Sequence, residues 1–431
     1  MSDAVASRMR EDWNQRAQED AHYYVAFGRR GQDLSEFIES GADVVRALEA
    51  EMKRLPPGNK RDRRALEIGC GPGRLMLPMS WNFGEVHGVD VSDEMIRRAF
   101  QTLRDVLNAF PRRNEGSNLA MFQDELFDFV YSYAVFQHIP SRDVVFEYLR
   151  EARRVLKPGG ILRCQVNGLP KTAREYTTWE GVRIGAEEIA EFAAANDMQL
   201  LALEGFSTQY MWTTMRKQPA GWYAGLSPRE GATRIRTVRN AHSGEPAVPD
   251  RGRFAAVTLW VENLPEEADL NQLNLLVEGV PAPLTYIGPP MPGPVWQVNA
   301  LLPGGVRTGW VPVDLEWLGR PLASGWVRVV PAGPSVPRVA SITDGVDLMA
   351  GTRIHSGSLK IAMEEVRQPE EVVVEVDGAP AEGLEHFCTD PLNERYEFNV
   401  TLAPEVRAGR HEVTVRMGRR AVGPVPIDVV R

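Results

Sequence analysis

A glycine-rich turn is the part of this 431-residue sequence with the clearest capacity for chemistry. It reads Glu67-Ile-Gly69-Cys-Gly71-Pro-Gly73-Arg74 and follows an apolar run typical of a buried strand. Glycine at such a turn lets a ligand approach the backbone where a Cβ atom would collide. A dinucleotide-binding turn needs a glycine five positions after the first, where this chain has Arg74. The spacing here is GxGxG, with an acid before it.

Three further segments follow the turn along the chain. Asp90 ends the next apolar run, and Val91 and Met95 come soon after it. A carboxylate at the end of a strand can accept hydrogen bonds from both hydroxyls of a ribose. The second segment is residues 114–119, with Glu115 and Gly116, and the third is residues 127–140, with Ser132 and His138.

In this order and spacing, the four segments resemble those of class I S-adenosylmethionine-dependent methyltransferases, over about residues 10 to 217. The resemblance implies S-adenosylmethionine as the cofactor, a cation without phosphate that an acid beside the turn favours. It implies that Asp90 holds the ribose and that Val91 and Met95 pack on the adenine. Glu115 would hold the adenine amino group, and the Gly116 amide a ring nitrogen. The implied cofactor contacts are Glu67, Gly69, Gly71, Gly73, Asp90, Val91, Met95, Glu115, Gly116 and Ser132.

Three of these assignments have a simpler alternative. Ser92 is expected to cap the next helix, and Asp90 could be a further capping acid there. Met95 fits an ordinary core position. Glu115 fits a surface loop. The segment around Glu115 departs from the family pattern, because Glu replaces the usual Asp and the strand before it, Phe110-Pro-Arg-Arg, is poorly formed.

The residue types near the expected site also include candidates for moving a proton. His138 follows the fourth expected strand, and an unperturbed imidazole titrates where a general base is useful at neutral pH. In some related enzymes such a histidine pairs with a tyrosine from an N-terminal helix, and Tyr23 and Tyr24 lie in such a helix here. The alternative for His138 is a residue that only holds the turn. Trp179 is an equal candidate for the acceptor pocket and for the core.

The acceptor is narrowed by motifs that the sequence lacks. No [DN]-P-P-[YFW] segment follows the fourth expected strand, which disfavours transfer to a nucleobase amino group. The acid cluster of metal-dependent catechol O-methyltransferases is not apparent either. A small-molecule, lipid or sugar acceptor, methylated on oxygen, nitrogen or carbon, remains.

Composition and charge point to a soluble protein without a nucleic-acid partner. The formal charge of −9 offers no attraction to a polyanion. The N-terminal residues lack the apolar region of a secretion signal, and no stretch approaches the roughly 20 apolar residues of a membrane span. Cys70, Cys164 and Cys388 are far apart, which indicates neither disulfides nor a metal site. We therefore expect a cytoplasmic location.

The elements that must position these residues alternate in the first half of the chain. Short apolar runs are separated by segments of helical period, such as Ile96, Phe100, Leu103 and Leu107. Alternating strands and helices predict a Rossmann-like α/β fold with a mostly parallel, doubly wound sheet, over residues 1–217. Its strand ends would gather the site residues at one edge.

The second half of the chain has short alternating strands between Pro and Gly turns, which predicts an all-β structure. Gln297-Val-Asn299 and the residues after it match Glu397-Phe-Asn399 at a constant offset of 100. This period suits two tandem sandwiches that resemble immunoglobulin-like, IPT-type modules, at residues 253–335 and 336–431. Residues 218–252, rich in Pro and Gly, would be an extended linker whose basic cluster is solvated.

The sandwiches suggest two roles, and a rival to catalysis. Their tryptophans at positions 296, 310, 317 and 326 could stack on a glycan, although tryptophan in alternating strands is more often core. The sandwiches could also form a homo-oligomer. The rival hypothesis is a non-catalytic scaffold that keeps the methyltransferase fold while the sandwiches bind a glycan or protein.

Overall fold

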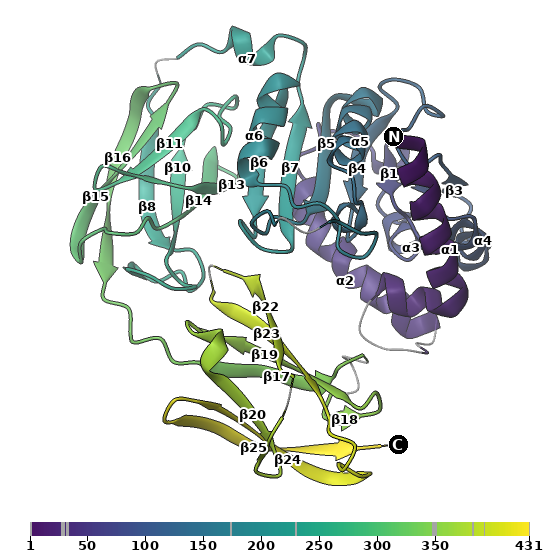
Figure 1. Cartoon of the computed structure of the whole chain (residues 1–431). Helices are drawn as coiled ribbons and strands as arrows, with labels where there is room; N and C mark the ends of the chain where they lie inside the picture. The colour runs from purple at the N-terminus through teal and green to yellow at the C-terminus, as the bar shows by residue number, and fades with distance from the viewer. Residues whose placement is uncertain are drawn as a thin grey trace. The chain divides into compact units, whose positions relative to one another are not determined.

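The chain divides into two compact units in a computed structural model that describes residues 2–26, 31, 34–172, 175–228, 231–346, 351–381, 383–391 and 393–430 (Figure 1). Unit 1 comprises residues 1–19 and 38–332, and unit 2 comprises residues 20–37 and 333–431. The division falls inside helix α1 (Ser2–Val25), where Asp20 has the non-helical angles φ −164° and ψ 88°.

Unit 1 begins with the doubly wound sheet that the sequence predicts. Its strands lie in the order β3-β2-β1-β4-β5-β7-β6, and the first five run parallel. β7 is antiparallel to both β5 and β6. The strands are β1 (Arg64–Ile68), β2 (Glu85–Asp90), β3 (Ala109–Arg113), β4 (Phe127–Ser132), β5 (Leu156–Val166), β6 (Met198–Glu204) and β7 (Met211–Lys217).

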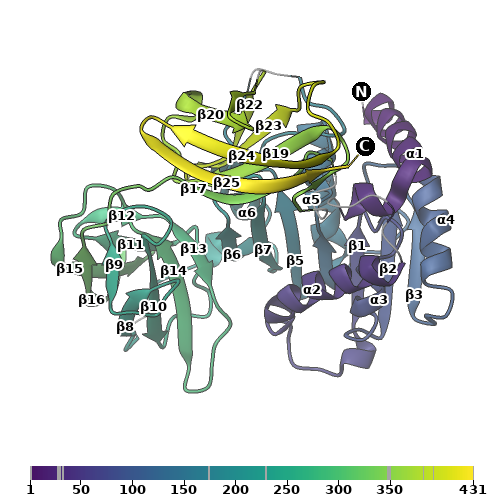
Figure 2. The ribbon, with the colours of Figure 1, turned by 90° about the horizontal axis from the view of Figure 1, so that it is seen from below.

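Helices flank this sheet and bury its apolar strands. α4 packs on β2 and β3, as Figure 2 shows, and α5 packs on β5. Central strand β4 is buried on both faces, as expected for a parallel sheet that is covered on both sides. The helices after α1 are α2 (Leu34–Met52), α3 (Met76–Met79), α4 (Asp93–Thr102), α5 (Arg142–Val155), α6 (Ala186–Ala195) and α7 (Trp222–Gly225). The 3₁₀ turns include η1 (Lys60–Asp62), η2 (Phe136–His138) and η4 (Pro369–Glu371).

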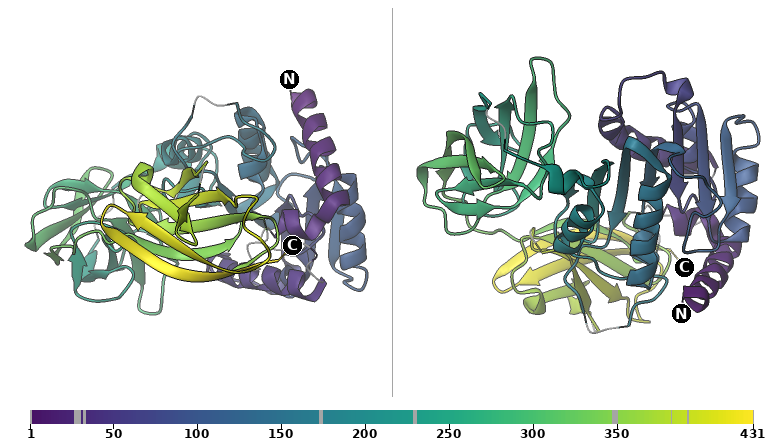
Figure 3. Two further views of the ribbon diagram at one scale, coloured as in Figure 1. Left: turned by 60° about the horizontal axis from the view of Figure 1, so that its bottom comes forward. Right: turned by 90° about the horizontal axis from the view of Figure 1, so that it is seen from above.

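The rest of unit 1, residues 234–330, forms what we call the first β-module. Two sheets, in the orders β13-β14-β10-β8 and β12-β11-β15-β16-β9, enclose one core to which both contribute (Figure 3). The strands are β8 (Arg234–Asn240), β9 (Ala247–Pro249), β10 (Ala256–Glu262), β11 (Leu273–Val277), β12 (Val280–Ala282), β13 (Leu284–Ile287), β14 (Val295–Leu301), β15 (Gly309–Trp317) and β16 (Arg320–Val330).

Unit 2 contains the second β-module, residues 338–429, which repeats the first strand by strand. Its sheets have the orders β22-β23-β19-β17 and β21-β20-β24-β25-β18. β23 and β24 begin 100 residues after β14 and β15, in agreement with the sequence repeat. The strands are β17 (Arg338–Asp344), β18 (Arg353–Ile354), β19 (Ser358–Glu364), β20 (Val372–Val376), β21 (Ala379–Pro380), β22 (Glu385–Asp390), β23 (Arg395–Thr401), β24 (Gly409–Met417) and β25 (Arg420–Val429).

The segment predicted as an extended linker is structured. Between residues 218 and 252, α7, β8 and β9 form, and the last two are strands of the first β-module. β8 pairs antiparallel with β10, and Arg234 and Arg236 in it bond to Glu262. The linker prediction was therefore wrong from residue 234 onward, because charged arginines on the exposed face of an edge strand disguised its alternation.

The first β-module also extends the methyltransferase-like sheet. β13 pairs antiparallel with β6, with Tyr286 opposite Ala202, which gives one sheet of 11 strands. Beside it, Leu270 N–H donates to Leu200 O at 2.9 Å. Asp269, fully buried, accepts hydrogen bonds from the Gln272 amide and the Tyr223 hydroxyl. The α/β part and the first β-module are thus one continuous structure.

Candidate active site

The glycine turn is anchored to the strands on either side of it. Gly69 N–H and Cys70 N–H both donate to Val89 O, at 2.7 and 2.9 Å, which fixes the turn to the end of β2. The Ser132 hydroxyl donates to Ile68 O at 2.9 Å and fixes it to β4. Ser132 is fully buried, and its hydrogen bond holds the glycine turn in position.

Glycine is required in the turn for a reason that the sequence did not reveal. Gly69 and Gly73 have φ values of +77° and +83°, which disfavour any other residue. A Cβ atom on Gly69 would lie 2.3 Å from the Val135 side chain, and one on Gly73 would lie 2.9 Å from Leu103. Protein side chains occupy the space beside these two glycines, whereas the sequence analysis expected a ligand there.

Asp90 joins the turn to the loop after β2. One carboxylate oxygen accepts from Gly71 N–H and the other from Ser92 N–H, both at 2.9 Å. Burial raises the pKa of Asp90 to about 6 against these hydrogen bonds. The helix cap is a different residue, because Ser92 Oγ accepts from Met95 N–H at 3.1 Å. The alternative of Asp90 as the capping acid is therefore wrong.

Glu67 lies buried at the end of β1. The Tyr131 hydroxyl donates to it at 3.0 Å. Burial raises the pKa of Glu67 to about 8, although the Tyr131 hydrogen bond and the charge of Arg74 act in the opposite direction. Arg74 is itself buried and donates to the Ser40 hydroxyl at 3.0 Å. The sequence pattern indicated an acid at position 67 but could not show whether its carboxyl group is protonated.

The residues expected around the adenine are only partly brought together. Val91 and Met95 are buried, and a Cβ atom on Gly116 would lie 2.9 Å from Val91. The Glu115 side chain is 65% exposed and pairs with Arg10 at 3.1 Å and with Arg113 at 2.8 Å. The guanidinium of Arg113 holds the pKa of Glu115 below its usual value, and that of Arg10 contributes less. Glu115 thus has the environment of a surface acid.

The neighbour of Glu115 is the buried polar group of this segment, and the sequence argument missed it. Asn114 Nδ2 donates to the Tyr148 hydroxyl at 2.8 Å, and Asn114 Oδ1 accepts from Gly116 N–H at 3.3 Å. Asn114 N–H also donates to Asp90 O at 3.0 Å. The segment is therefore fixed to β2 through Asn114.

The part of α1 within unit 1 touches the loops after β2 and β3. Asn14 Oδ1 accepts from the Ser92 hydroxyl at 2.7 Å and from Glu94 N–H at 3.1 Å. Arg10 pairs with Glu115. Neither Asn14 nor Arg10 was singled out from the sequence, because only the fold brings α1 to these loops, some 80 to 105 residues away in sequence.

The same helix contacts the loops after β4 and β5. The Trp13 ring meets His138 edge-on, with centroids 5.4 Å apart, and Arg16 donates to Thr178 O at 3.1 Å. The Arg16 guanidinium also lies 4.8 Å from the Trp13 centroid and 5.4 Å from that of Trp179. An aromatic and cationic cluster therefore lies at the carboxyl edge of the sheet, where ligands of open α/β sheets bind.

His138 is held in one tautomer by its neighbours. Nδ1 lies 2.7 Å from Trp179 O, so this nitrogen carries the proton and donates it. Nε2 lies 3.4 Å from Gln137 Nε2 and is left as the acceptor. Burial lowers the pKa of His138 to about 4, so the imidazole is neutral at pH 7. The Trp179 ring, 43% exposed, lies beside it.

The two candidate tyrosines lie in unit 2. The Tyr23 hydroxyl donates to Val346 O at 3.1 Å, and the rings of Tyr23 and Tyr24 meet edge-on at 5.1 Å. The N-terminal helix in which both tyrosines were expected is interrupted at Asp20, before it reaches them. Asp20 carboxylate oxygens accept from Tyr23 N–H and Gly31 N–H instead.

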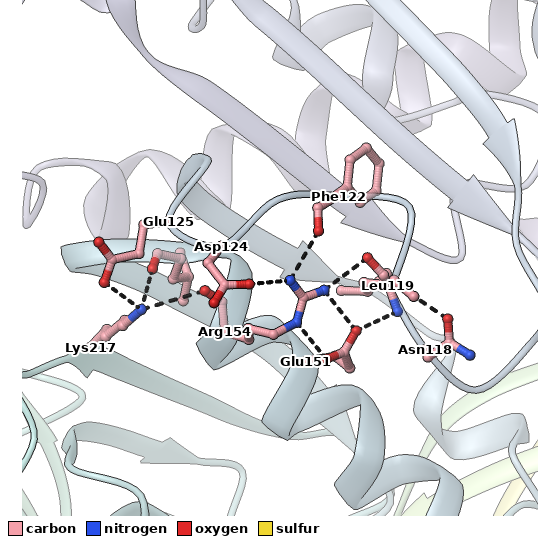
Figure 4. A network of polar contacts seen from close by, with 10 residues as sticks. Asn118, Leu119, Phe122, Asp124, Glu125, Glu151, Arg154 and Lys217 are labelled. Carbon is pink, nitrogen blue, oxygen red and sulfur yellow. Dashed lines mark hydrogen bonds and ion pairs between the residues drawn. The ribbon is translucent and has the colours of Figure 1, made fainter.

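A polar network fixes the segment that leads away from Gly116 (Figure 4). Arg154 of α5 donates to Leu119 O at 3.0 Å and to Phe122 O at 2.9 Å. It also pairs with Glu151 at 2.7 Å and with Asp124 at 2.6 Å. Glu151 accepts from Leu119 N–H at 2.9 Å. The segment is thereby clamped to α5.

Among the described residues, no group of three or more His, Cys, Asp or Glu side chains is arranged to hold a metal ion. In the same part of the chain, no helix is both long enough and apolar enough to span a membrane.

Comparison with known proteins identifies the type of domain. Residues 66–164 match a family described as a methyltransferase domain. A probable methyltransferase of Aspergillus luteorubrus is 30% identical over 129 residues, which are 27% of this chain and 45% of that protein. An uncharacterized methyltransferase of Schizosaccharomyces pombe is 27% identical over 201 residues, 43% of this chain and 70% of that protein. The chain thus spans less than half of the first relative.

One solved structure aligns with part of the chain. Phosphoethanolamine N-methyltransferase 1 of Haemonchus contortus, in complex with phosphoethanolamine and S-adenosylhomocysteine, aligns at 11% identity over 53% of this chain and 52% of that chain, with a TM-score of 0.39. The family match carries the conclusion: the chain contains a methyltransferase domain, and S-adenosylmethionine is its cofactor. The corresponding sequence predictions are confirmed.

Proposed function

We propose that this chain is an S-adenosylmethionine-dependent methyltransferase that acts on an oxygen or nitrogen atom of a small-molecule, lipid or sugar acceptor. The observation that carries the proposal is Asp90, whose carboxylate joins the glycine turn to the end of β2. Each oxygen accepts one backbone N–H and keeps a lone pair for a ribose hydroxyl. The methyltransferase match over residues 66–164 supports the same activity.

The other cofactor contacts follow from the arrangement around Asp90. Val91, Met95 and Gly116 would form the adenine side, since they are buried or closely packed together. Glu67 and the turn would face the cationic end, because a buried carboxyl favours a positive neighbour. When bound, the cofactor supplies a methyl group on a sulfonium, and these residues orient it for in-line attack.

We assign proton removal, where the acceptor needs it, to His138. Its Nδ1 donates to Trp179 O, so only Nε2 can take a proton. A neutral imidazole is in the right form for a base at pH 7, and its pKa of about 4 makes it a weak one. Tyr23 and Tyr24 are less suited, because the Tyr23 hydroxyl is already bonded to Val346 O.

Isothermal calorimetry of the full chain with S-adenosylmethionine and with S-adenosylhomocysteine tests the cofactor site. We expect binding of both, and a loss of at least tenfold in affinity for Asp90→Ala, about 1.4 kcal/mol. Asp93→Ala is the matched control, since this acid begins α4 beside the site and pairs with Arg113 at 3.3 Å. Undiminished binding by Asp90→Ala would overturn the assignment.

Turnover is tested separately from binding. Acceptor classes are screened with the full chain, and the S-adenosylhomocysteine that forms is measured. A chain that binds the cofactor but forms no product with any small-molecule, lipid or sugar acceptor would favour the alternative, a non-catalytic scaffold with this fold.

A further inference from the structure

The first β-module carries two kinds of tryptophan, and the structure separates them. Trp296 and Trp317 are 7% and 1% exposed and belong to the core between the two sheets. Trp310 and Trp326 are each 60% exposed. A large aromatic ring that stays this open to water gains little from the fold, so its place needs another explanation.

The two exposed rings share one face of one sheet. β15 and β16 are antiparallel neighbours, and in their register Trp310 lies opposite Arg328 while Pro312 lies opposite Trp326. The residues between them, such as Val311 and Val327, are buried, so the even-numbered positions face outward. Trp310 and Trp326 are thus diagonal neighbours, at about 7 to 8 Å, on the outer face.

Polar groups lie within the same patch. Ser324 and Arg328 flank Trp326 on β16, and both face outward. The Ser324 hydroxyl donates to Asp314 at 2.7 Å, and this pair lies two pairs along the ladder from Trp326, at the next outward-facing position. The outer face of β15 and β16 therefore combines two open ring faces with a carboxylate and hydroxyl pair on one side and a guanidinium on the other.

The second β-module shows that the fold does not require these tryptophans. β24 and β25 repeat β15 and β16 with the same pairing, and Glu412 lies opposite Pro426. The position of Trp310 is taken by Arg410, and that of Trp326 by Pro426. The same sheet thus forms without an aromatic residue at either place.

The mixture of groups fits a sugar better than a protein surface. A pyranose ring offers an apolar C–H face that stacks on an aromatic ring and an edge of hydroxyls that hydrogen-bond with Asp314, Ser324 and Arg328. The buried centre of a protein interface is depleted of charge and spread over about 800 Å² per partner. Here charged groups stand directly beside the two rings.

We propose that the outer face of β15 and β16 is a carbohydrate-binding platform, on which Trp310 and Trp326 stack against sugar rings of a neutral glycan chain. Asp314 and Arg328 bind the hydroxyls at the edges of those rings. The platform lies on strands that the methyltransferase domain does not use, so the proposal does not depend on methyl transfer.

Affinity electrophoresis of the full chain tests the platform. Native gels are cast with and without laminarin, xylan, hydroxyethyl cellulose or dextran, and the shift in mobility gives the affinity. We expect at least one of these polysaccharides to retard the protein, and Trp310→Ala and Trp326→Ala each to weaken that affinity about tenfold. Trp81→Ala is the control, because Trp81 is 62% exposed but lies in the methyltransferase domain.

Three results would overturn the proposal. The first is unchanged mobility in every polysaccharide, and the second is retardation that both platform variants retain. The third is self-association in sedimentation velocity that Trp310→Ala abolishes, which would assign this face to a second copy of the chain. Unchanged melting temperatures of the variants would exclude misfolding as the cause of lost retardation, as expected for exposed positions.

Discussion

In the cofactor site that we propose, the buried Glu67 and the partly buried Asp90 meet a cationic cofactor, and this makes binding a proton-linked event. Burial raises the pKa of Glu67 to about 8, so it is mostly protonated at neutral pH. A positive charge beside it favours the carboxylate. We predict that binding of S-adenosylmethionine at pH 7 releases a proton, up to about one per site.

Calorimetry in buffers of different ionisation enthalpy measures this release. S-adenosylhomocysteine, which has no sulfonium charge, should release fewer protons, and Glu67→Gln should release almost none from this site. Heats that do not depend on the buffer would contradict the prediction.

Glu67 also makes the stability of the free protein depend on pH. Its native pKa of about 8 exceeds the ordinary value of 4.5. Its stabilising contribution to the free energy of unfolding is therefore complete at low pH and is lost as the pH rises through 8.

His138 determines the acidic side of the pH profile that we expect for methyl transfer. Because burial lowers its pKa to about 4, a base at this position stays active through the range in which an ordinary histidine titrates, near 6.5. At saturating S-adenosylmethionine, where Glu67 no longer titrates, we expect kcat/KM for the acceptor to fall on the acidic side only below about pH 5. A limb near pH 6.5 in the native enzyme, or an unchanged profile in His138→Ala, would remove His138 from proton transfer.

From the sequence, the positions of the candidate residues were easier to obtain than the environments that the fold gives them. Asp90 at the end of β2 and Ser92 as the helix cap were both expected from the sequence, and the observed hydrogen bonds confirm the cap. Glu115 was chosen over its neighbour Asn114 on the pattern alone. Two arginines, one of them from α1, hold Glu115 at the surface, and no local signal indicates a partner 105 residues away.

At the scale of elements, the glycine turn depends on its close contact with the loop after β4. Gly69→Ala combines a positive φ with a Cβ atom 2.3 Å from Val135. We predict a loss of about 2–4 kcal/mol in the free energy of unfolding, together with loss of cofactor binding. Denaturant unfolding and calorimetry measure the two effects.

Gly221 supplies the control for this substitution. Its φ of +78° is almost the same as that of Gly69, yet nothing lies within 4 Å of its would-be Cβ atom. Gly221→Ala should therefore cost only the backbone strain, about 1–2 kcal/mol. Equal losses in the two variants would show that the contact with Val135 contributes nothing.

The clamp on α5 gives a second prediction for an element. Arg154→Met removes the donors to Leu119 O and Phe122 O and leaves Glu151 without its main partner. We expect a loss of about 1–3 kcal/mol and weaker cofactor binding, because the clamped segment leads away from Gly116. Arg150→Met, whose ion pair with Glu147 is half exposed, should change stability by less than about 0.5 kcal/mol.

Strands and helices could be predicted where the apolar periodicity of the sequence is strong. They were missed where charged residues obscure that periodicity. Four of the five parallel strands and the offset of 100 between the modules were read correctly from the sequence. The strand expected to be poorly formed, Phe110-Pro-Arg-Arg, is regular, because β3 pairs with β2 over its whole length. β8 was missed because arginine fills its exposed positions between Pro and Gly segments. The pairing of β13 with β6 has no local signature, since it depends on a tertiary contact.

At the scale of the whole molecule, the two units should unfold as separate cooperative transitions in calorimetric scans. Asp269 of unit 1 and Asp344 of unit 2 are both fully buried and accept backbone hydrogen bonds. We predict that Asp269→Ala lowers only the transition of unit 1 and Asp344→Ala only that of unit 2, each by a few degrees.

Added S-adenosylhomocysteine identifies the transitions, since it should raise only that of unit 1. The first β-module is included in this transition because its sheet continues that of the methyltransferase domain. A third transition, insensitive to Asp269→Ala and to the cofactor product, would show that the first β-module folds independently.

The single pairing between β6 and β13 has a consequence for synthesis on the ribosome. β22 is the equivalent of β13 in the second β-module, and we expect it to compete with β13 for the edge at β6 while the chain is unfolded. β13 is made about 100 residues before β22, a lead of roughly 5 to 20 s at ordinary elongation rates. During synthesis, β13 can therefore pair with β6 before β22 has been made. During refolding from denaturant, both strands are present from the start. Yields from refolding should therefore fall short of yields from synthesis.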